Sequence, residues 1–224
     1  MSQIELINHP DYIAFIAPFP CRVLSSAVLN GGLTGTRSLL NLRVDKHQPP
    51  PWPSPRDTLS AQAQKLALPQ PVTGMMTAAS MKSLGTAQAD DGGLMVQCWV
   101  TAGLSNLLRA GDPADGVPVP GTINIWLYIN QPLTDAALAE ALILLTESKV
   151  TAVRDAGLQS PVSHLPASGT GTDSHAVICP QSSADGLDYC GKHTRAGELI
   201  GRTVLSACQQ SISLCQRAII SGDT

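Results

Sequence analysis

The segment 169–174, GTGTDS, concentrates groups that could do chemistry, because three hydroxyls and one carboxylate fall within six residues. Its two glycines let backbone N–H groups approach a ligand closely. This composition predicts a site that holds a polar substrate or stabilises an oxyanion on backbone donors. A tight turn before a strand is the alternative interpretation, and the missing Walker lysine excludes a P-loop. The residues are Gly169, Thr170, Gly171, Thr172, Asp173 and Ser174.

A second candidate lies at the start of a long helix that we predict over residues 194–220. The helix dipole disfavours a protonated imidazole at His193, which leaves the ring available as a base near neutral pH. Glu198 follows about one turn later, between Gly197 and Gly201, and this four-residue glycine spacing permits close backbone packing. A capping histidine beside a helix-packing groove is the alternative interpretation.

Three more polar residues occupy places where a packed structure would have to account for them. Lys149 lies on the apolar stripe of a helix predicted over 134–155, and an unpaired buried ammonium is costly. It therefore either extends to solvent or meets a carboxylate or ligand at the sheet edge. Glu147 points to a neighbouring face of that helix. Asn106 follows a strand in a glycine-hinged turn and could donate to a carbonyl oxygen, although turn formation explains it equally well.

The elements that must position these groups alternate between strands and helices. Hydrophobic periodicity predicts strands at 14–17, 22–29, 39–44, 94–101, 122–130 and 175–179, and helices at 57–68, 134–155 and 194–220. Residues 75–87 are ambiguous, and the proline-rich segment 47–56 predicts a surface loop. We expect an α+β (mixed α/β) fold in a single domain over 1–224. Its mainly antiparallel or mixed sheet is covered by helices, including a long C-terminal helix.

Composition excludes several functional classes. The chain has 224 residues, a net charge of -3, 14% charged and 4% aromatic residues, which disfavours nucleic acid as a partner. It contains no apolar run of about 18 residues, and its first residues lack the basic start of a secretory signal, so no membrane association is expected. Its six cysteines form no CxxC pair and predict buried thiols in a cytoplasmic protein. The glycine-spaced helix faces would accommodate a homodimer.

Seven segments, taken in order, resemble the adenosylcobinamide amidohydrolase family. The resemblance covers about residues 14–208, with two small departures: Ser148 replaces an expected alanine, and Ser174-His175 follows Asp173 where small apolar residues are usual. The segments are LSSAVLNGG (24–32), TAA (77–79), TAGLSN (101–106) with RAGD (109–112), GTINI (121–125), TESK (146–149), GTGTDS (169–174), and HT (193–194) with GELIG (197–201).

The resemblance implies a salvage enzyme of cobamide metabolism. Such an amidohydrolase cleaves the amide between a propionate side chain of the corrin ring and 1-aminopropan-2-ol, and releases adenosylcobyric acid. The substrate is itself a cobalt corrinoid, and no separate cofactor is implied. A non-catalytic corrinoid carrier or sensor is the competing interpretation. The expected substrate-binding residues are Asn106, Asn124, Lys149, Gly169, Thr170, Gly171, Thr172 and Ser174.

Amide hydrolysis needs an activated nucleophile, donors for the oxyanion and a proton for the leaving amine. The preferred hypothesis is attack by water, with His193 or Asp173 as base and Glu198 or Glu147 as the acid or orienting group. Backbone amides of residues 169–172 and the Asn106 amide would bind the oxyanion.

Two other mechanisms remain open. Thr170, Thr172 or Ser174 could act as a covalent nucleophile with His193 as its base, or, less favoured, as an N-terminal nucleophile after cleavage before Thr170 or Thr172. The third hypothesis is a divalent metal held by Asp173, His193 and Glu198. It is not the preferred one, and our prediction assigns no metal ligands.

Overall fold

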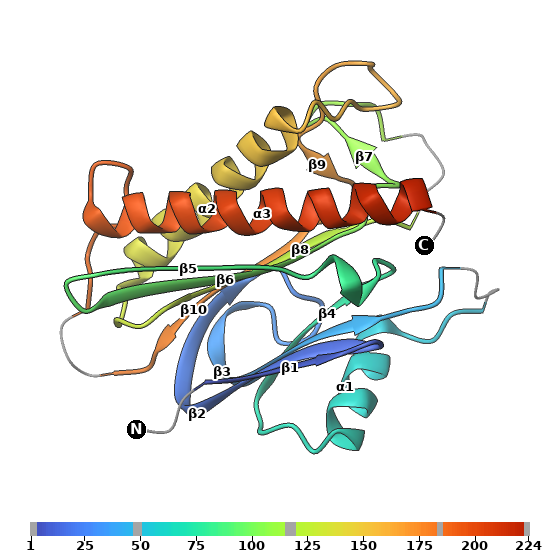
Figure 1. The fold of residues 1–224 in the computed structure, drawn as a ribbon. Coiled ribbons are helices and arrows are strands. Elements are labelled where there is room, and N and C mark those ends of the chain that lie inside the picture. The colour runs from blue at the N-terminus through green and yellow to red at the C-terminus, as the bar shows by residue number, and fades with distance from the viewer. Residues whose placement is uncertain (1–3, 47–50, 115–119, 183–185, 222–224) are drawn as a thin grey trace.

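Eight strands form one mixed sheet in the computed structural model, which describes residues 4–46, 51–114, 120–182 and 186–221 (Figure 1). The strand order is β4-β3-β2-β10-β8-β6-β5, with β1 paired to β2. The β8–β10 and β3–β4 pairs are parallel, and the other pairs are antiparallel. The strands are β1 (Glu5–His9), β2 (Tyr12–Ser25), β3 (Gly32–Arg43), β4 (Val72–Thr77), β5 (Gly85–Asp91), β6 (Leu94–Ala102), β8 (Ile123–Ile129) and β10 (Ser174–Pro180).

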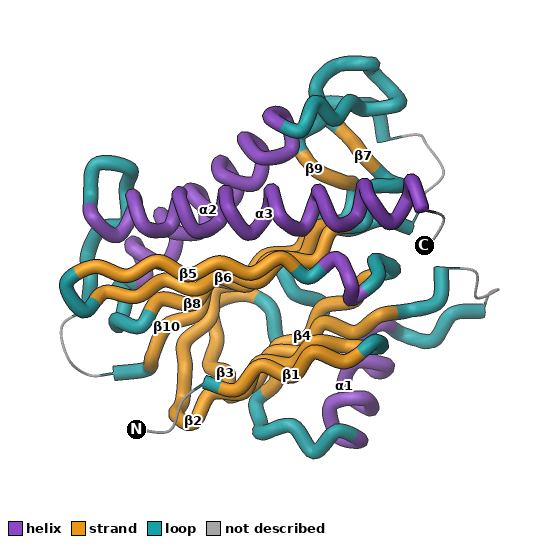
Figure 2. The backbone as a smooth tube through the Cα atoms, in the orientation of Figure 1, coloured by secondary structure: helices purple, strands orange, loops and turns teal. Residues whose placement is uncertain are grey.

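The sheet bends over itself, so that its two halves face each other (Figure 2). The half made of β5, β6, β8 and β10 packs one face against helices α2 (Asp135–Asp155) and α3 (Arg195–Ser221). Its other face packs against β2, β3 and β4, and the rings of Phe15 and Trp99 meet across this interface with centroids 5.6 Å apart. Helix α1 (Pro55–Lys65) covers the outer face of the second half. The predicted mixed sheet, covered by helices and followed by a long C-terminal helix, is confirmed.

Alternation along β8 shows how the sequence produces this layering. Ile125, Leu127 and Ile129 face the helices, whereas Trp126 and Tyr128 face the other half of the sheet. Successive side chains of a strand point to opposite faces, so a strand buried on both faces must be apolar throughout. The polar residue Asn124 breaks that rule, and it belongs to the site described below.

The helix that carries Lys149 has the predicted bounds, because its end signals are strong. Thr134 caps α2 by accepting a hydrogen bond from the Ala137 N–H at 3.2 Å, and Gly157 follows its end with φ +69°. Helix α3 begins in the same way, with the Thr194 hydroxyl accepting from the Gly197 N–H at 2.9 Å.

The strand predictions near the N-terminus were wrong in detail. Residues 14–17 and 22–29 are not two strands: they lie in or just after β2, a single strand whose pairing with β3 shifts between Ile16 and Cys21. Pro18 and Pro20 occupy this interval, and without an N–H they interrupt the ladder rather than the strand. Strand β3 starts at Gly32, seven residues before the predicted 39–44 segment.

Two further segments differ from expectation. The ambiguous 75–87 stretch contains the end of β4, a short 3-10 helix (Met81–Ser83) and the start of β5. Helix α1 starts two residues earlier than predicted, because Pro55 suits the first helical turn and Ser54 caps it. Of the predicted 47–56 surface loop, residues 47–50 lie outside the described part, 51–54 are exposed, and 55–56 belong to the helix.

All six cysteines are free, and five of them are buried in the core. In the portion of the chain that the structure describes, no helix has the length and apolar character needed to span a bilayer.

Candidate active site

A buried ion pair lies at the end of the sheet. The Lys149 Nζ is 2.7 Å from Asp173 Oδ2, and the two side chains are only 7% and 9% exposed. Asp173 also accepts from the Thr170 hydroxyl at 2.5 Å, from the Thr170 N–H at 3.2 Å and from the Ile123 N–H at 3.0 Å. Lys149 donates in addition to the Ser168 carbonyl at 2.9 Å. Of the two alternatives that the sequence left open for Lys149, the structure contains the one in which it meets a carboxylate.

Gly169 makes this arrangement possible. A Cβ on Gly169 would lie 2.1 Å from Asp173 Oδ2 and 2.4 Å from Lys149 Nζ, and the backbone φ is +154°. Only a residue without a side chain lets the backbone pass this close to the pair. Gly169 and Thr170 form the two-residue strand β9 (Gly169–Thr170), which pairs with β7 (Leu107–Leu108).

The second half of the glycine–threonine segment contacts the turns before and after β7. The Thr172 hydroxyl donates to the Gly121 carbonyl at 3.0 Å and lies 2.7 Å from the Thr122 hydroxyl. The Gly171 N–H donates to the Asn106 backbone carbonyl at 3.2 Å. The N–H groups of Thr170 and Gly171, two of the predicted oxyanion donors, are therefore already engaged.

A row of polar side chains crosses the sheet at Asn124, the residue that follows Ile123 on β8. Asn124 pairs in register with Thr101 on β6 and with Ser174 on β10, so the three side chains face the opposite half of the sheet together. The Asn124 Nδ2 donates to Asn41 Oδ1 at 2.8 Å and to the Met76 carbonyl at 3.0 Å. The Asn41 Nδ2 donates in turn to the Thr101 hydroxyl at 2.8 Å.

Sequence reasoning did not identify Asn41, Thr101 and Thr122 as residues of the candidate site. Asn41 and Thr101 belong to the row at Asn124, and Thr122 contacts Thr172. A signal for Asn41 was present, because it is the one polar residue in the run LLNL of a predicted strand. A polar residue at a buried strand position needs a partner, but nothing in the sequence identifies Asn124 as that partner.

His175 lies beside the ion pair, on the face of β10 that α2 covers. The Thr146 hydroxyl donates to the Leu142 carbonyl at 2.9 Å and lies 3.5 Å from His175 Nδ1. The Nε2 atom of His175 is buried, and the described residues supply no hydrogen-bond partner for it. Burial and the nearby Lys149 charge lower the pKa of His175 to about 4, against the opposing effect of Asp173.

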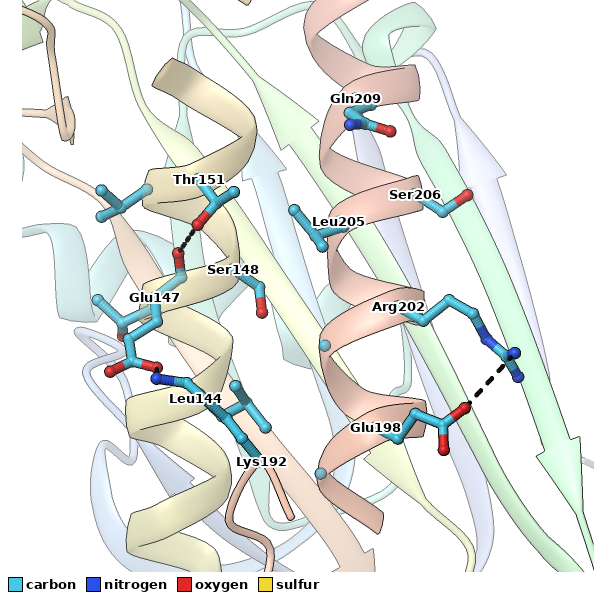
Figure 3. Close-up of a pocket in the computed structure, with 14 residues that line it drawn as sticks. Leu144, Glu147, Ser148, Thr151, Lys192, Glu198, Arg202, Leu205, Ser206 and Gln209 are labelled. Atoms are coloured by element: carbon cyan, nitrogen blue, oxygen red, sulfur yellow. Dashed lines mark hydrogen bonds and ion pairs between the residues drawn. The ribbon is translucent and has the colours of Figure 1, made fainter. Parts of the chain in front are cut away.

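Three of the four predicted catalytic residues lie elsewhere. Glu147 forms an ion pair with Lys192 on the outer side of α2, and Glu198 pairs with Arg202 on α3 (Figure 3). Glu198 also pairs with Arg195. His193 is exposed just before α3. Among the described residues, no hydrogen bond or ion pair joins these three to Asp173. The structure therefore does not assemble the predicted set, and their catalytic roles stay predictions.

The helix groove between α2 and α3 has a volume of about 940 Å³ and opens on the surface that carries Glu147 and Glu198. Ser148, the predicted departure from the family pattern, lines it together with Gly197 and Gly201. Across the ranges that the structure describes, no three His, Cys, Asp or Glu side chains are grouped to hold a metal ion, and the hypothetical trio of Asp173, His193 and Glu198 is not assembled.

A second hollow, here called the cleft, has a volume of about 590 Å³. Gly103, Ser105 and Gly121 line its inner end, and the last turns of α3 line one wall. Gly121 links the cleft to the glycine–threonine segment, because it lines the cleft and its carbonyl accepts a hydrogen bond from the Thr172 hydroxyl.

The group formed by Lys149, Thr170 and Asp173, here called the polar site, can carry out proton transfer. Thr170 places a hydroxyl within hydrogen-bond reach of a carboxylate, and Lys149 fixes that carboxylate from its other side. A hydroxyl, a base and a group that orients the base form the pattern expected of an activated nucleophile, or of a carboxylate that activates water.

Comparison with known proteins identifies relatives over most of the chain. The family model described as CbiZ, adenosylcobinamide amidohydrolase, matches residues 1–219. The protein named adenosylcobinamide amidohydrolase from Methanosarcina mazei is 28% identical over 197 residues, which are 84% of this chain and 89% of that protein. The uncharacterised protein MJ1613 from Methanocaldococcus jannaschii is 35% identical over 150 residues, and the match spans 58% of each chain.

Among solved structures, the PH0078 protein from Pyrococcus horikoshii OT3 gives a TM-score of 0.42 at 11% identity. The superposition covers 94% of this chain and 78% of that one.

Proposed function

The chain belongs to the adenosylcobinamide amidohydrolase family, and we propose that it hydrolyses the amide between the corrin ring's propionate side chain and 1-aminopropan-2-ol. The family match over residues 1–219 carries this proposal. The alignment with the Methanosarcina mazei protein of that name over 84% of the chain supports it. The products are adenosylcobyric acid and the free amino alcohol.

Within this proposal, Asp173 is the base. Its carboxylate takes the proton of the attacking hydroxyl, which belongs either to water or to Thr170, 2.5 Å away. Attack by water breaks the C–N bond, adds OH to the carbonyl carbon and returns the proton to the leaving amine. Attack by Thr170 first forms an ester and releases the amine, and water then cleaves that ester.

Lys149 has a positioning role in this scheme. Its ammonium, 2.7 Å from Asp173 Oδ2, balances the charge of the buried carboxylate and holds it against the loop. Because both side chains are less than a tenth exposed, water screens their interaction little.

The decisive experiment is incubation of chelator-treated protein with adenosylcobinamide, followed by mass spectrometry. We expect loss of adenosylcobinamide and appearance of adenosylcobyric acid. Asp173→Asn should lower kcat by a factor on the order of 10² to 10⁴, the usual contribution of a positioned base. Thr170→Val should abolish turnover if Thr170 is the nucleophile and reduce it only modestly if water attacks.

The exposed carboxylates provide the matched control. The double variant Glu147→Gln/Glu198→Gln should keep kcat within about twofold of the wild type, whereas a loss equal to that of Asp173→Asn would move the base to the helix groove. Tight corrinoid binding without turnover under any condition, metal supplementation included, would replace the proposal with a carrier or sensor function.

A further inference from the structure

We propose that the cleft beside the polar site is the corrinoid-binding pocket, and that the larger helix groove is not. This inference rests on the proposed function, because it takes a corrinoid as the ligand. The volumes of the cleft, about 590 Å³, and of the helix groove, about 940 Å³, both fall in the range of about 300–1,000 Å³ that is usual for small-molecule sites, so the choice between them rests on their walls.

The walls of the cleft come from distant parts of the chain. They are the turn between β1 and β2, the end of β3 with the residues that follow it, the segment between β4 and β5, the turn after β6, the residues before β8, and the last turns of α3. The helix groove, in contrast, is bounded by two helices that run in the same direction and by Lys192, and its charged side chains pair with one another (Figure 3). A ligand in the cleft can therefore be surrounded on several sides.

The chemistry of the walls matches a large, partly apolar ring with amides at its periphery. Leu214, Ala218 and Ile219 present apolar surface from α3, and Ile219 is 53% exposed although it is a large hydrophobic residue. The lining also carries the exposed side chains of Asp11 and Asp45 and those of the cations Arg43, Lys46 and Lys82. Such cations donate hydrogen bonds to carboxamide carbonyls.

The connection to the reacting groups is short. Gly103 and Gly121 line the cleft, the Gly103 N–H donates to the Thr122 carbonyl at 2.9 Å, and Gly121 accepts from the Thr172 hydroxyl. A Cβ on Gly121 would lie 2.7 Å from the Asn106 backbone nitrogen, so these turns pack in close contact. A corrin ring in the cleft would therefore direct a side-chain amide towards the glycine–threonine segment.

One substitution made at two places on α3 tests the proposal. Ala218→Trp fills the cleft, and Ser206→Trp fills the helix groove in the same way. Binding of dicyanocobinamide is measured by equilibrium dialysis and corrin absorbance, which the added tryptophan does not disturb. We expect Ala218→Trp to raise Kd at least tenfold and Ser206→Trp to leave Kd within twofold.

Ala78→Leu, on the opposite wall of the cleft, covers the case in which Ala218→Trp does not fold. It should raise Kd by at least threefold with the thermal unfolding midpoint unchanged. Unchanged Kd in folded cleft variants, or a larger loss from Ser206→Trp, would overturn the cleft assignment while leaving hydrolysis by the wild type intact. A wild type that binds the corrinoid in the cleft but does not hydrolyse adenosylcobinamide would instead overturn the proposed function alone.

Discussion

The Lys149 ammonium donates to the Asp173 carboxylate at 2.7 Å in a position almost closed to water, and it brings the middle of α2 to the loop before β10. A buried pair of this kind need not add net stability, since both ions lose their hydration on folding. Removing one partner is a different matter, because the other charge then remains buried alone.

Lys149→Met should therefore destabilise the fold by about 3–5 kcal/mol, the range for breaking a buried pair. The double variant Lys149→Met/Asp173→Asn should be more stable than Lys149→Met alone, because the carboxylate left unpaired is then absent. Urea unfolding of the wild type, both single variants and the double variant gives the coupling free energy. Additive effects of the two substitutions would show that the ions do not interact.

Gly169→Ala tests the close passage of the backbone along this pair. The new Cβ would meet Asp173 Oδ2 at 2.1 Å and Lys149 Nζ at 2.4 Å, at a φ of +154°. Overpacking and backbone strain together should cost about 3 kcal/mol. The control is Gly191→Ala, where a Cβ meets nothing within 4 Å. Equal unfolding midpoints for the two variants would contradict the geometry at Gly169.

His175 predicts a loss of stability on mild acidification. Its pKa is about 4 in the folded protein and 6.5 as a reference, since burial and Lys149 disfavour the cation. Above pH 6.5 the ring is neutral in both states. Between pH 6.5 and 4 the unfolded chain takes up the proton first, so stability falls as pH falls, by about 3 kcal/mol in all.

The measurement is the free energy of unfolding from pH 8 to pH 4 for the wild type and for His175→Gln. Carboxylates titrate in both proteins, so the contribution of His175 is the difference between the two curves. We expect that difference to shrink or change sign as the pH falls below 6.5. Parallel curves over the whole interval would mean that the imidazole titrates alike in both states.

The elements that support the site follow from local signals, whereas its assembly depends on long-range contacts. The Thr134 cap and the apolar stripe predict the bounds of α2, whereas the stripe left open whether Lys149 extends to solvent or meets a carboxylate. The division of β2 into two strands was wrong, because whether prolines end a strand or only interrupt its pairing depends on the neighbouring strand.

The residues of the candidate site also divide into those that local sequence signals identify and those that only long-range contacts bring together. The glycine–threonine segment was found from its composition, because clustered hydroxyls, a carboxylate and glycines are visible in the chain itself. Glu147 and Glu198 were equally visible, and the structure places them on an outer helix surface in exposed ion pairs. The strand order decides which polar residues come into contact, and the strand order was not predicted from the sequence.

The Asn41–Asn124 contact gives a last prediction, with the opposite dependence on pH. In Asn124→Asp an acceptor replaces the Nδ2 donor, so a carboxylate would face Asn41 Oδ1 and the Met76 carbonyl at a position only 2% exposed. At pH 7 we expect a loss of about 3 kcal/mol, because a buried charge is left without a donor. Burial raises the pKa of such a carboxyl, so its protonated form can donate to these acceptors in the folded state. The deficit relative to the wild type should therefore shrink as the pH falls from 7 towards 4. Asn8→Asp, on the exposed edge strand β1, provides the control with the same charge change, and an Asn124→Asp deficit that stays constant with pH would contradict the contact.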